Sequence, residues 1–136
     1  MRSLSMTNFE TLKEYVGELG FRVVSENPAE ELMVIEKSDN GITGMILDIE
    51  DPILIIEQLI CEVKTGPGLE SLRSLLQMNR SLIHGAFALD ETGTRVIFRD
   101  TIQMQNLDKN AVESSINALS LALAEYSGRL IQISKG

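Results

Sequence analysis

The chain contains few of the residue types on which most enzymes and secreted domains depend. Its 136 residues include one histidine, His84, one cysteine, Cys61, and no tryptophan. A single histidine excludes two-histidine metal sites such as HExxH, and a single cysteine excludes an internal disulfide. Neither GxxxxGK[S/T] nor GxGxxG occurs, so no phosphate-binding loop is indicated. The sequence therefore predicts no catalytic residue, no cofactor, no metal ion and a reducing compartment.

Long apolar runs are also missing. No uncharged stretch reaches the roughly 18 residues that suggest a membrane-spanning helix, and residues 1–6 lack the apolar core of a signal peptide. We therefore expect a cytoplasmic protein with no membrane partner. Aromatic residues make up 4% of the chain, so the core should be aliphatic with methionine as filler. The length suits one domain over residues 1–136.

Basic residues are almost absent between Glu26 and Glu62, where Lys37 faces ten acidic residues. Phosphate would be repelled there, so neither nucleic acid nor anionic membrane is expected as a partner. Asp48–Asp51 offers oxygen ligands but lacks the spacing of a calcium loop. Two interpretations stay open: a solvated surface that aids solubility, or an acidic face that steers a basic partner segment. The candidate steering face comprises Glu30, Glu31, Glu36, Asp48, Glu50 and Asp51.

The first half predicts one helix and four strands. Thr7 and Glu10 have the spacing of a capping box, and Gly20 is placed to end the helix in the left-handed conformation. Apolar residues at helical spacing between them form one face: Phe9, Leu12, Val16 and Leu19. Strand-like segments follow at 21–25, 32–36, 42–49 and 53–63, with a hairpin turn at Asn40-Gly41.

The segment 53–63 is apolar on both faces of the predicted strand. One face carries Ile53, Ile55, Leu59, Cys61 and Val63, and the other carries Leu54, Ile56 and Ile60. An antiparallel strand of this kind usually has both faces covered. Helices would cover one face, so we expect a homodimer or a partner protein to cover part of the other. The candidate partner or dimer surface comprises Ile53, Leu54, Ile55, Ile56, Leu59 and Ile60.

The second half predicts a helix, a hairpin and a long helix. In the first helix, over 69–80, the expected inward stripe is Leu69, Leu72, Leu76 and Asn79. The hairpin joins 85–89 to 95–104, and Asp100 interrupts its apolar face, where a hydrogen-bonded carboxylate is expected. His84, at the start of the hairpin, is interpreted as a surface or hydrogen-bonded residue, and Cys61 as a buried one.

Asn106 or Asp108 can cap the last helix. Its apolar stripe comprises Val112, Ile116, Leu119, Leu123, Tyr126, Leu130 and Ile133, and a row of small residues beside it comprises Ala111, Ser115, Ala118 and Ala122. Such a surface permits close packing on the chain's own sheet, and a contribution to a subunit contact is the alternative. Ser120 is expected on the opposite, solvent-facing side.

The order of these elements resembles the type III secretion chaperone-like superfamily, in particular its Tir-chaperone and YbjN-like branches. The most specific part is a helix ending in Leu75–Arg80, followed by the Gly85–Gly93 turn and the strand Val96–Arg99. The resemblance implies an α+β fold in which an antiparallel sheet of five to six strands packs with three helices, in the order α-β-β-β(-β)-α-β-β-α. It also implies a domain, commonly a homodimer, that binds other polypeptides without catalysis.

Three functional hypotheses follow. The first is a chaperone-like or regulatory adaptor that binds a protein partner as a homodimer, with extended chains held on apolar sheet surface. The second is a structural or regulatory dimer without a client site. The third is a small-molecule-binding protein or an enzyme, which would show an apolar pocket with a few converging polar groups. A broad open apolar surface favours the first hypothesis.

Overall fold

The helices and strands follow the predicted order. The computed structural model describes residues 6–136; residues 1–5, where the sequence predicts no signal peptide, lie outside the described part. The elements are α1 (Asn8–Glu18), β1 (Arg22–Asn27), β2 (Leu32–Lys37), β3 (Ile42–Glu50), β4 (Ile53–Glu62), α2 (Leu69–Asn79), β5 (Ala86–Leu89), β6 (Arg95–Gln103) and α3 (Lys109–Ser134), with short 3₁₀ helices η1 (Ser38–Asn40) and η2 (Met104–Asn106). The predicted α+β class is confirmed.

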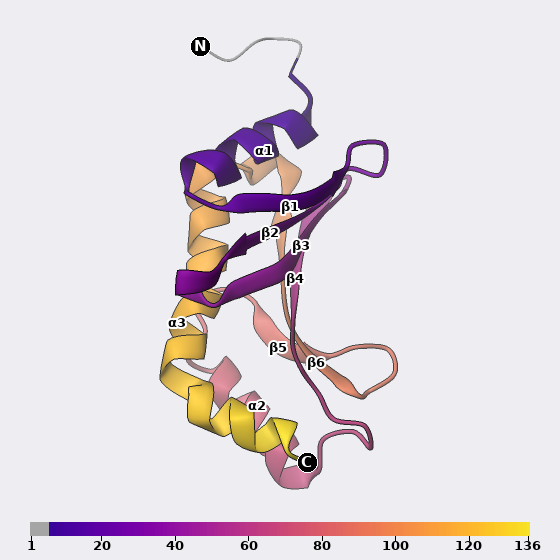
Figure 1. Cartoon of the computed structure of the whole chain (residues 1–136), viewed down its shortest axis with the longest axis vertical. Helices are drawn as coiled ribbons and strands as arrows, with labels where there is room; N and C mark the ends of the chain where they lie inside the picture. The colour runs from indigo at the N-terminus through magenta and orange to yellow at the C-terminus, as the bar shows by residue number, and fades with distance from the viewer. Residues whose placement is uncertain (1–5) are drawn as a thin grey trace.

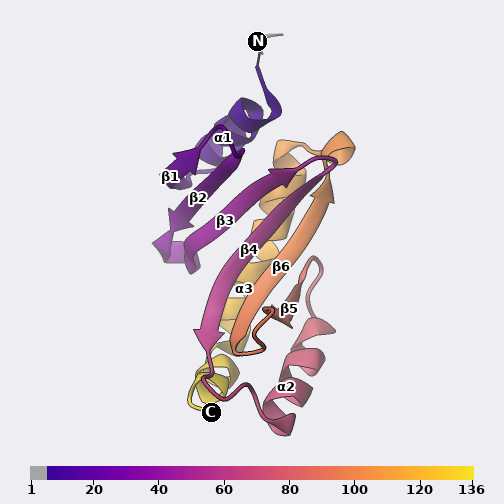
Figure 2. The ribbon, with the colours of Figure 1, turned by 90° about the vertical axis from the view of Figure 1, so that its right-hand side faces the viewer.

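The strands form one antiparallel sheet in the order β1-β2-β3-β4-β6-β5. The helix α3 runs along one face of the sheet, with α1 against the β1 end and α2 beside β5 (Figure 1). Figure 2 shows β3, β4 and β6 in front of α3, and no helix of residues 6–136 crosses the face nearest the viewer. We call the helix-covered face the inner face and the other the outer face.

Local signals account for the first helix as predicted. The Thr7 Oγ1 accepts a hydrogen bond from the Glu10 backbone N–H at 3.1 Å, and Gly20 takes a φ of +88° after the helix ends. Phe9, Leu12 and Val16 are buried. The helix presents its apolar face to the core because capping and periodicity agree.

The strand β4 departs from the simple alternation that the sequence suggests. Leu54 and Ile56 face inward and are fully buried, but the pairing with β6 shifts between Leu59 and Cys61. The extra residue of such a bulge inverts the alternation beyond it. Val63 is therefore buried, and the prediction that it shares a face with the half-exposed Ile53 is wrong.

The inward stripe predicted for α2 is partly wrong. Leu75 and Met78 are buried against the core, whereas Leu69 and Leu76 are 71% and 69% exposed. The helix has leucines on two adjacent stripes, and packing against β5 and α3 selects one of them. Asn79 is oriented by a different contact, because its side-chain amide bonds both the N–H (2.8 Å) and the C=O (3.1 Å) of Phe87 on β5. This pair of bonds attaches α2 to the hairpin.

The long helix α3 is capped by Asp108, whose Oδ1 accepts a hydrogen bond from the Ala111 N–H at 2.7 Å. Most of its predicted stripe is buried, with Leu119 fully so and Leu123 half-buried. The expectation that Ser120 faces solvent is wrong. Its hydroxyl donates to the Asn40 carbonyl at 2.7 Å, since the turn between β2 and β3 lies against this side of the helix.

Candidate functional site

The outer face of the sheet carries apolar side chains that no helix among residues 6–136 covers. Directly paired residues of neighbouring strands point to the same face. Val34 pairs with Ile46, which pairs with Glu57, and Leu59 pairs with Ile97. Ile46 and Leu59 are 40% and 53% exposed. An ion pair between Glu57 and Arg99 crosses this face beside them. We call this the outer sheet surface: Leu32, Val34, Ile46, Ile53, Ile55, Leu59 and Ile97.

The structure divides the residues predicted as a partner or dimer surface. Ile53, Ile55 and Leu59 belong to the outer sheet surface. Leu54 and Ile56 are fully buried, and Ile60 is half-buried against the core. These last three therefore stabilise the fold instead of lining the open face, because alternation sends neighbouring side chains to opposite faces.

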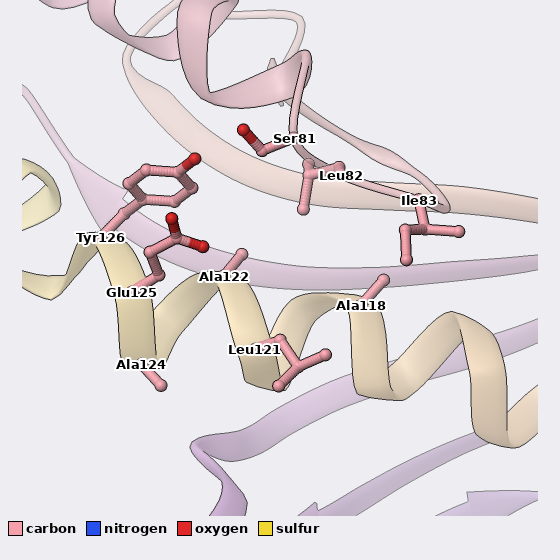
Figure 3. A pocket seen from close by; sticks show the side chains of 9 residues that line it. All are labelled: Ser81, Leu82, Ile83, Ala118, Leu121, Ala122, Ala124, Glu125 and Tyr126. Atoms are coloured by element: carbon pink, nitrogen blue, oxygen red, sulfur yellow. The ribbon is translucent and has the colours of Figure 1, made fainter.

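A second apolar surface lies on the helical side, between α3 and the loop after α2. Figure 3 shows Ile83 and Leu82 from the loop facing the small residues Ala118 and Ala122 of α3, with Leu121 between these two along the helix and directed away from the loop. The groove encloses about 450 Å³. Ile83 is 81% exposed and Leu121 is 66% exposed. The row of alanines was visible in the sequence, but the loop that completes the groove was not. We call this the helical groove.

Four of the ten acidic residues between Glu26 and Glu62 form ion pairs with basic residues. Ion pairs join Glu26 to Lys13, Glu36 to Arg22, Glu57 to Arg99 and Glu62 to Arg95. Each basic partner lies outside the acidic segment, so these ion pairs could not be predicted from the sequence. Glu36 is consequently not an unpaired member of the steering face.

Glu30, Glu31, Asp48 and Glu50 gather at one end of the sheet, whereas Asp39 lies in η1 at the other end of β2 and the predicted Asp51 is exposed in the turn after β3. The negative charge and a hydrogen bond of Asp48, with smaller contributions from Glu30 and Glu31, raise the pKa of Glu50 above its usual range. The Ile49 N–H donates to the Glu31 carbonyl at 3.0 Å, which holds the turn after β1 against β3. Among residues 6–136 these four acids form no ion pair. They make a concentrated negative patch, which we call the acidic cluster.

The other residues that could be reactive, Cys61 and His84, lie in environments that fit a structural role. Burial raises the pKa of the Cys61 thiol, which disfavours the thiolate that a reactive cysteine needs. His84 is exposed in the loop before β5. In the part of the chain that the structure describes, no group of three or more His, Cys, Asp or Glu side chains could hold a metal ion. Over the same residues, no helix is long and apolar enough to cross a membrane.

Solved structures share this fold at low sequence identity. YbjN of E. coli, described as a putative transcription regulator, is 17% identical with a TM-score of 0.65, covering 93% of this chain and 95% of that one. The HopA1–SchA chaperone–effector complex gives 16% identity and a TM-score of 0.60, covering 98% and 100%. The Yersinia pestis type III secretion chaperone SycH, in complex with a fragment of YscM2, gives 17% and 0.55, covering 94% and 100%.

The family assignment comes from the sequence comparison. A search of curated proteins finds no match. The CesT_Tir_1 family model matches residues 5–136, nearly the whole chain. The resemblance predicted from the Leu75–Arg80 helix end and the following hairpin is thereby confirmed. The chain belongs to the CesT/Tir chaperone family, whose members are non-catalytic.

Proposed function

We propose that this protein is a chaperone-like or regulatory adaptor that holds an extended segment of a partner polypeptide against the outer sheet surface. The observation that carries the proposal is a sheet with apolar side chains on both faces and helices on one of them. An open apolar surface of this kind suits a peptide better than a small molecule, which needs an enclosed pocket. The chaperone–effector and SycH–YscM2 complexes show relatives of this fold with protein partners.

The acidic cluster supports a partner with basic residues beside its apolar ones. Glu30, Glu31, Asp48 and Glu50 flank the outer sheet surface at the ends of β2 and β3. Complementary charge accelerates association more than it strengthens the final complex. We accordingly assign steering to the acidic cluster and affinity to the apolar face. A cytoplasmic location and one domain over residues 1–136 are part of the same proposal.

The helical groove is proposed as the contact of a homodimer. In a two-fold contact the same patch meets itself, so a patch flanked by unpaired like charges is unfavourable. The outer sheet surface is flanked by the four carboxylates of the acidic cluster, whereas the groove has one, Glu125, beside Ile83, Leu121 and the alanines between them. The outer sheet surface then binds the partner polypeptide, and the helical groove binds the second copy of the chain.

Site-specific photo-crosslinking in the cells that naturally produce this protein tests whether a partner binds the outer sheet surface. A photoreactive phenylalanine analogue at Leu59 should yield an adduct with a partner protein, and the same analogue at the exposed Glu14 of α1 is the control. Ile55→Asp should abolish the Leu59 adduct while the circular dichroism spectrum stays native. No adduct at Leu59, or equal adducts at both positions, would contradict the proposal.

Association kinetics test the steering role once the partner is known. Replacing Glu30 and Glu31 by Lys should slow association and weaken its salt dependence, because exposed charges are screened within about 8 Å at physiological ionic strength. The apolar contact should leave the dissociation rate nearly unchanged. If neither salt nor the charge reversal changes the association rate, the acidic cluster does not steer the partner and contributes to solubility alone.

Light scattering tests the dimer. The chain has a mass of 15.1 kDa, so a homodimer should double that value at tens of micromolar. Leu121→Glu should return the mass to that of the monomer, since a carboxylate buried in an apolar contact is costly. Leu59→Asp, on the other surface, should leave the dimer intact. A monomeric wild-type protein would refute this part of the proposal.

A further inference from the structure

A pocket lies where β6 ends and α3 begins. It is separate from the outer sheet surface and from the helical groove. It encloses about 380 Å³ and is lined among others by Asp100, Ile102, Asn106, Ala111, Ser114 and Ser115. Ser115 is 1% exposed and its hydroxyl donates to the Asp100 Oδ2 at 2.7 Å. The half-buried carboxylate of Asp100 therefore lines the pocket beside the buried Ser115.

The charge of Asp100 is not neutralised within the described chain. Its Oδ1 accepts from the Thr101 N–H at 2.8 Å, so both oxygens have neutral donors. No Lys, Arg or His nitrogen of residues 6–136 lies within ion-pair distance of it, although the exposed His84 lines the same pocket. A partly buried carboxylate without a counter-charge is costly, and an incoming cation would relieve that cost.

The walls of the pocket suit the rest of a basic side chain. Ile102 and Ala111 offer apolar contact for the methylene stem of lysine or arginine. Asn106 and Ser114 offer oxygen acceptors for the N–H groups that Asp100 leaves free. The volume is near the lower end of ligand-binding pockets, which favours one inserted side chain over a larger molecule.

We propose that this pocket binds one lysine or arginine side chain of the partner polypeptide. The proposal rests on the proposed function, since it names a specificity site for the same partner. The half-buried carboxylate would form a charge-assisted hydrogen bond with the inserted cation, which is about twice as strong as a neutral one. A partner segment reaching from the outer sheet surface to this pocket would thus be selected for a basic residue at one position.

The test uses amino-acid analogues and needs no knowledge of the partner. N-acetyl-arginine methylamide and N-acetyl-lysine methylamide are titrated into the ¹⁵N-labelled protein, with the neutral N-acetyl-citrulline methylamide as the matched probe. We expect the amide signals of Asp100, Ala111 and Ser114 to shift with the two cationic probes and not with citrulline. Asp100→Asn should weaken this binding about tenfold or more.

Two variants make the result decisive. Glu14→Gln removes an exposed carboxylate from α1, outside the pocket, and should leave the titration unchanged. Ser114→Leu keeps the Asp100 carboxylate and fills the pocket, so it should abolish binding even if Asp100→Asn fails to fold. Shifts that appear at the acidic cluster, equal binding of citrulline, or no shift with any probe would overturn the proposal. Failure of the Leu59 crosslink would instead overturn the proposed function, so the two failures are distinguishable.

Discussion

Gly85 and Gly93 provide a matched pair that tests how tightly the β5–β6 hairpin is packed on the core. Both glycines have positive φ, +71° and +73°. A Cβ at Gly85 would lie 2.6 Å from the Phe98 Cζ and 2.9 Å from the Arg99 carbonyl oxygen, whereas one at Gly93 would meet nothing within 4 Å. Phe98 is fully buried, so its ring has no free space into which to move. An alanine at either position is subject to backbone strain, but only the one at Gly85 also meets a steric conflict. Comparing the two variants therefore separates these contributions.

The magnitudes follow from these two contributions. Left-handed backbone costs an alanine about 1–2 kcal/mol, and both variants should lose that much stability. Overpacking of the core adds about 1–3 kcal/mol for Gly85→Ala alone. With an unfolding entropy of about 2.1 cal/mol/K per residue, each kcal/mol lowers the Tm of a chain of this length by about 3.5 °C. Gly85→Ala should therefore melt about 4–10 °C below Gly93→Ala.

Thermal and urea unfolding at one fixed protein concentration measure this difference, because the Tm of a self-associating protein depends on concentration. The far-ultraviolet circular dichroism of each variant before heating serves as the control for folding. Equal midpoints for Gly85→Ala and Gly93→Ala would refute the reasoning, since they would mean that the Phe98 ring yields without cost.

Three further variants test the fold by urea unfolding. Leu119→Ala should cost about 2–5 kcal/mol because Leu119 is fully buried, whereas Ile131→Ala on the same helix, 55% exposed, should stay within about 0.5 kcal/mol. Equal losses would mean that the buried face of α3 is misassigned. Asn79→Ala should cost about 1–3 kcal/mol, because two Phe87 backbone groups lose their partner; an unchanged midpoint would contradict this.

Glu50→Gln tests the acidic cluster through pH. Asp48 raises the pKa of Glu50 in the folded state, so folding takes up a proton and stability falls as pH rises from the ordinary value of 4.5 through the raised value. Removing the charge should therefore stabilise the protein at pH 7 and give no such gain well below 4.5. The Tm values of Glu50→Gln and of the unmodified protein at the two pH values measure this gain. A lower Tm for the variant at pH 7 would contradict the raised pKa of Glu50.

Local signals explain why so much of the fold was predictable. The Thr7 and Asp108 caps, the glycines at positions 20 and 41 with positive φ, and the alternation of β6 act within a few residues. The stripe of α3 extends over many turns, so its buried face was identified even though Leu123 proved to be half-buried. Asp100 was expected to be hydrogen-bonded, and it accepts from Ser115.

Features that depend on distant residues were decided by the tertiary structure. Leucines on two stripes of α2 were equivalent in sequence, and packing on β5 and α3 buried Leu75 instead of Leu76. The sequence of the acidic segment suggests a continuous negative charge. In the structure, Arg22 and Arg99, which lie outside that segment, form ion pairs with Glu36 and Glu57.

The sequence by itself determined the order of elements, their caps and the family, because these depend on short-range periodicity and turn chemistry. Only the tertiary structure decided which apolar residues stay exposed. Ile83 and Leu121 form a groove because a loop and a helix, far apart in sequence, meet there. The bulge after Leu59 sends Val63 into the core, since one extra residue reverses the direction of every side chain beyond it.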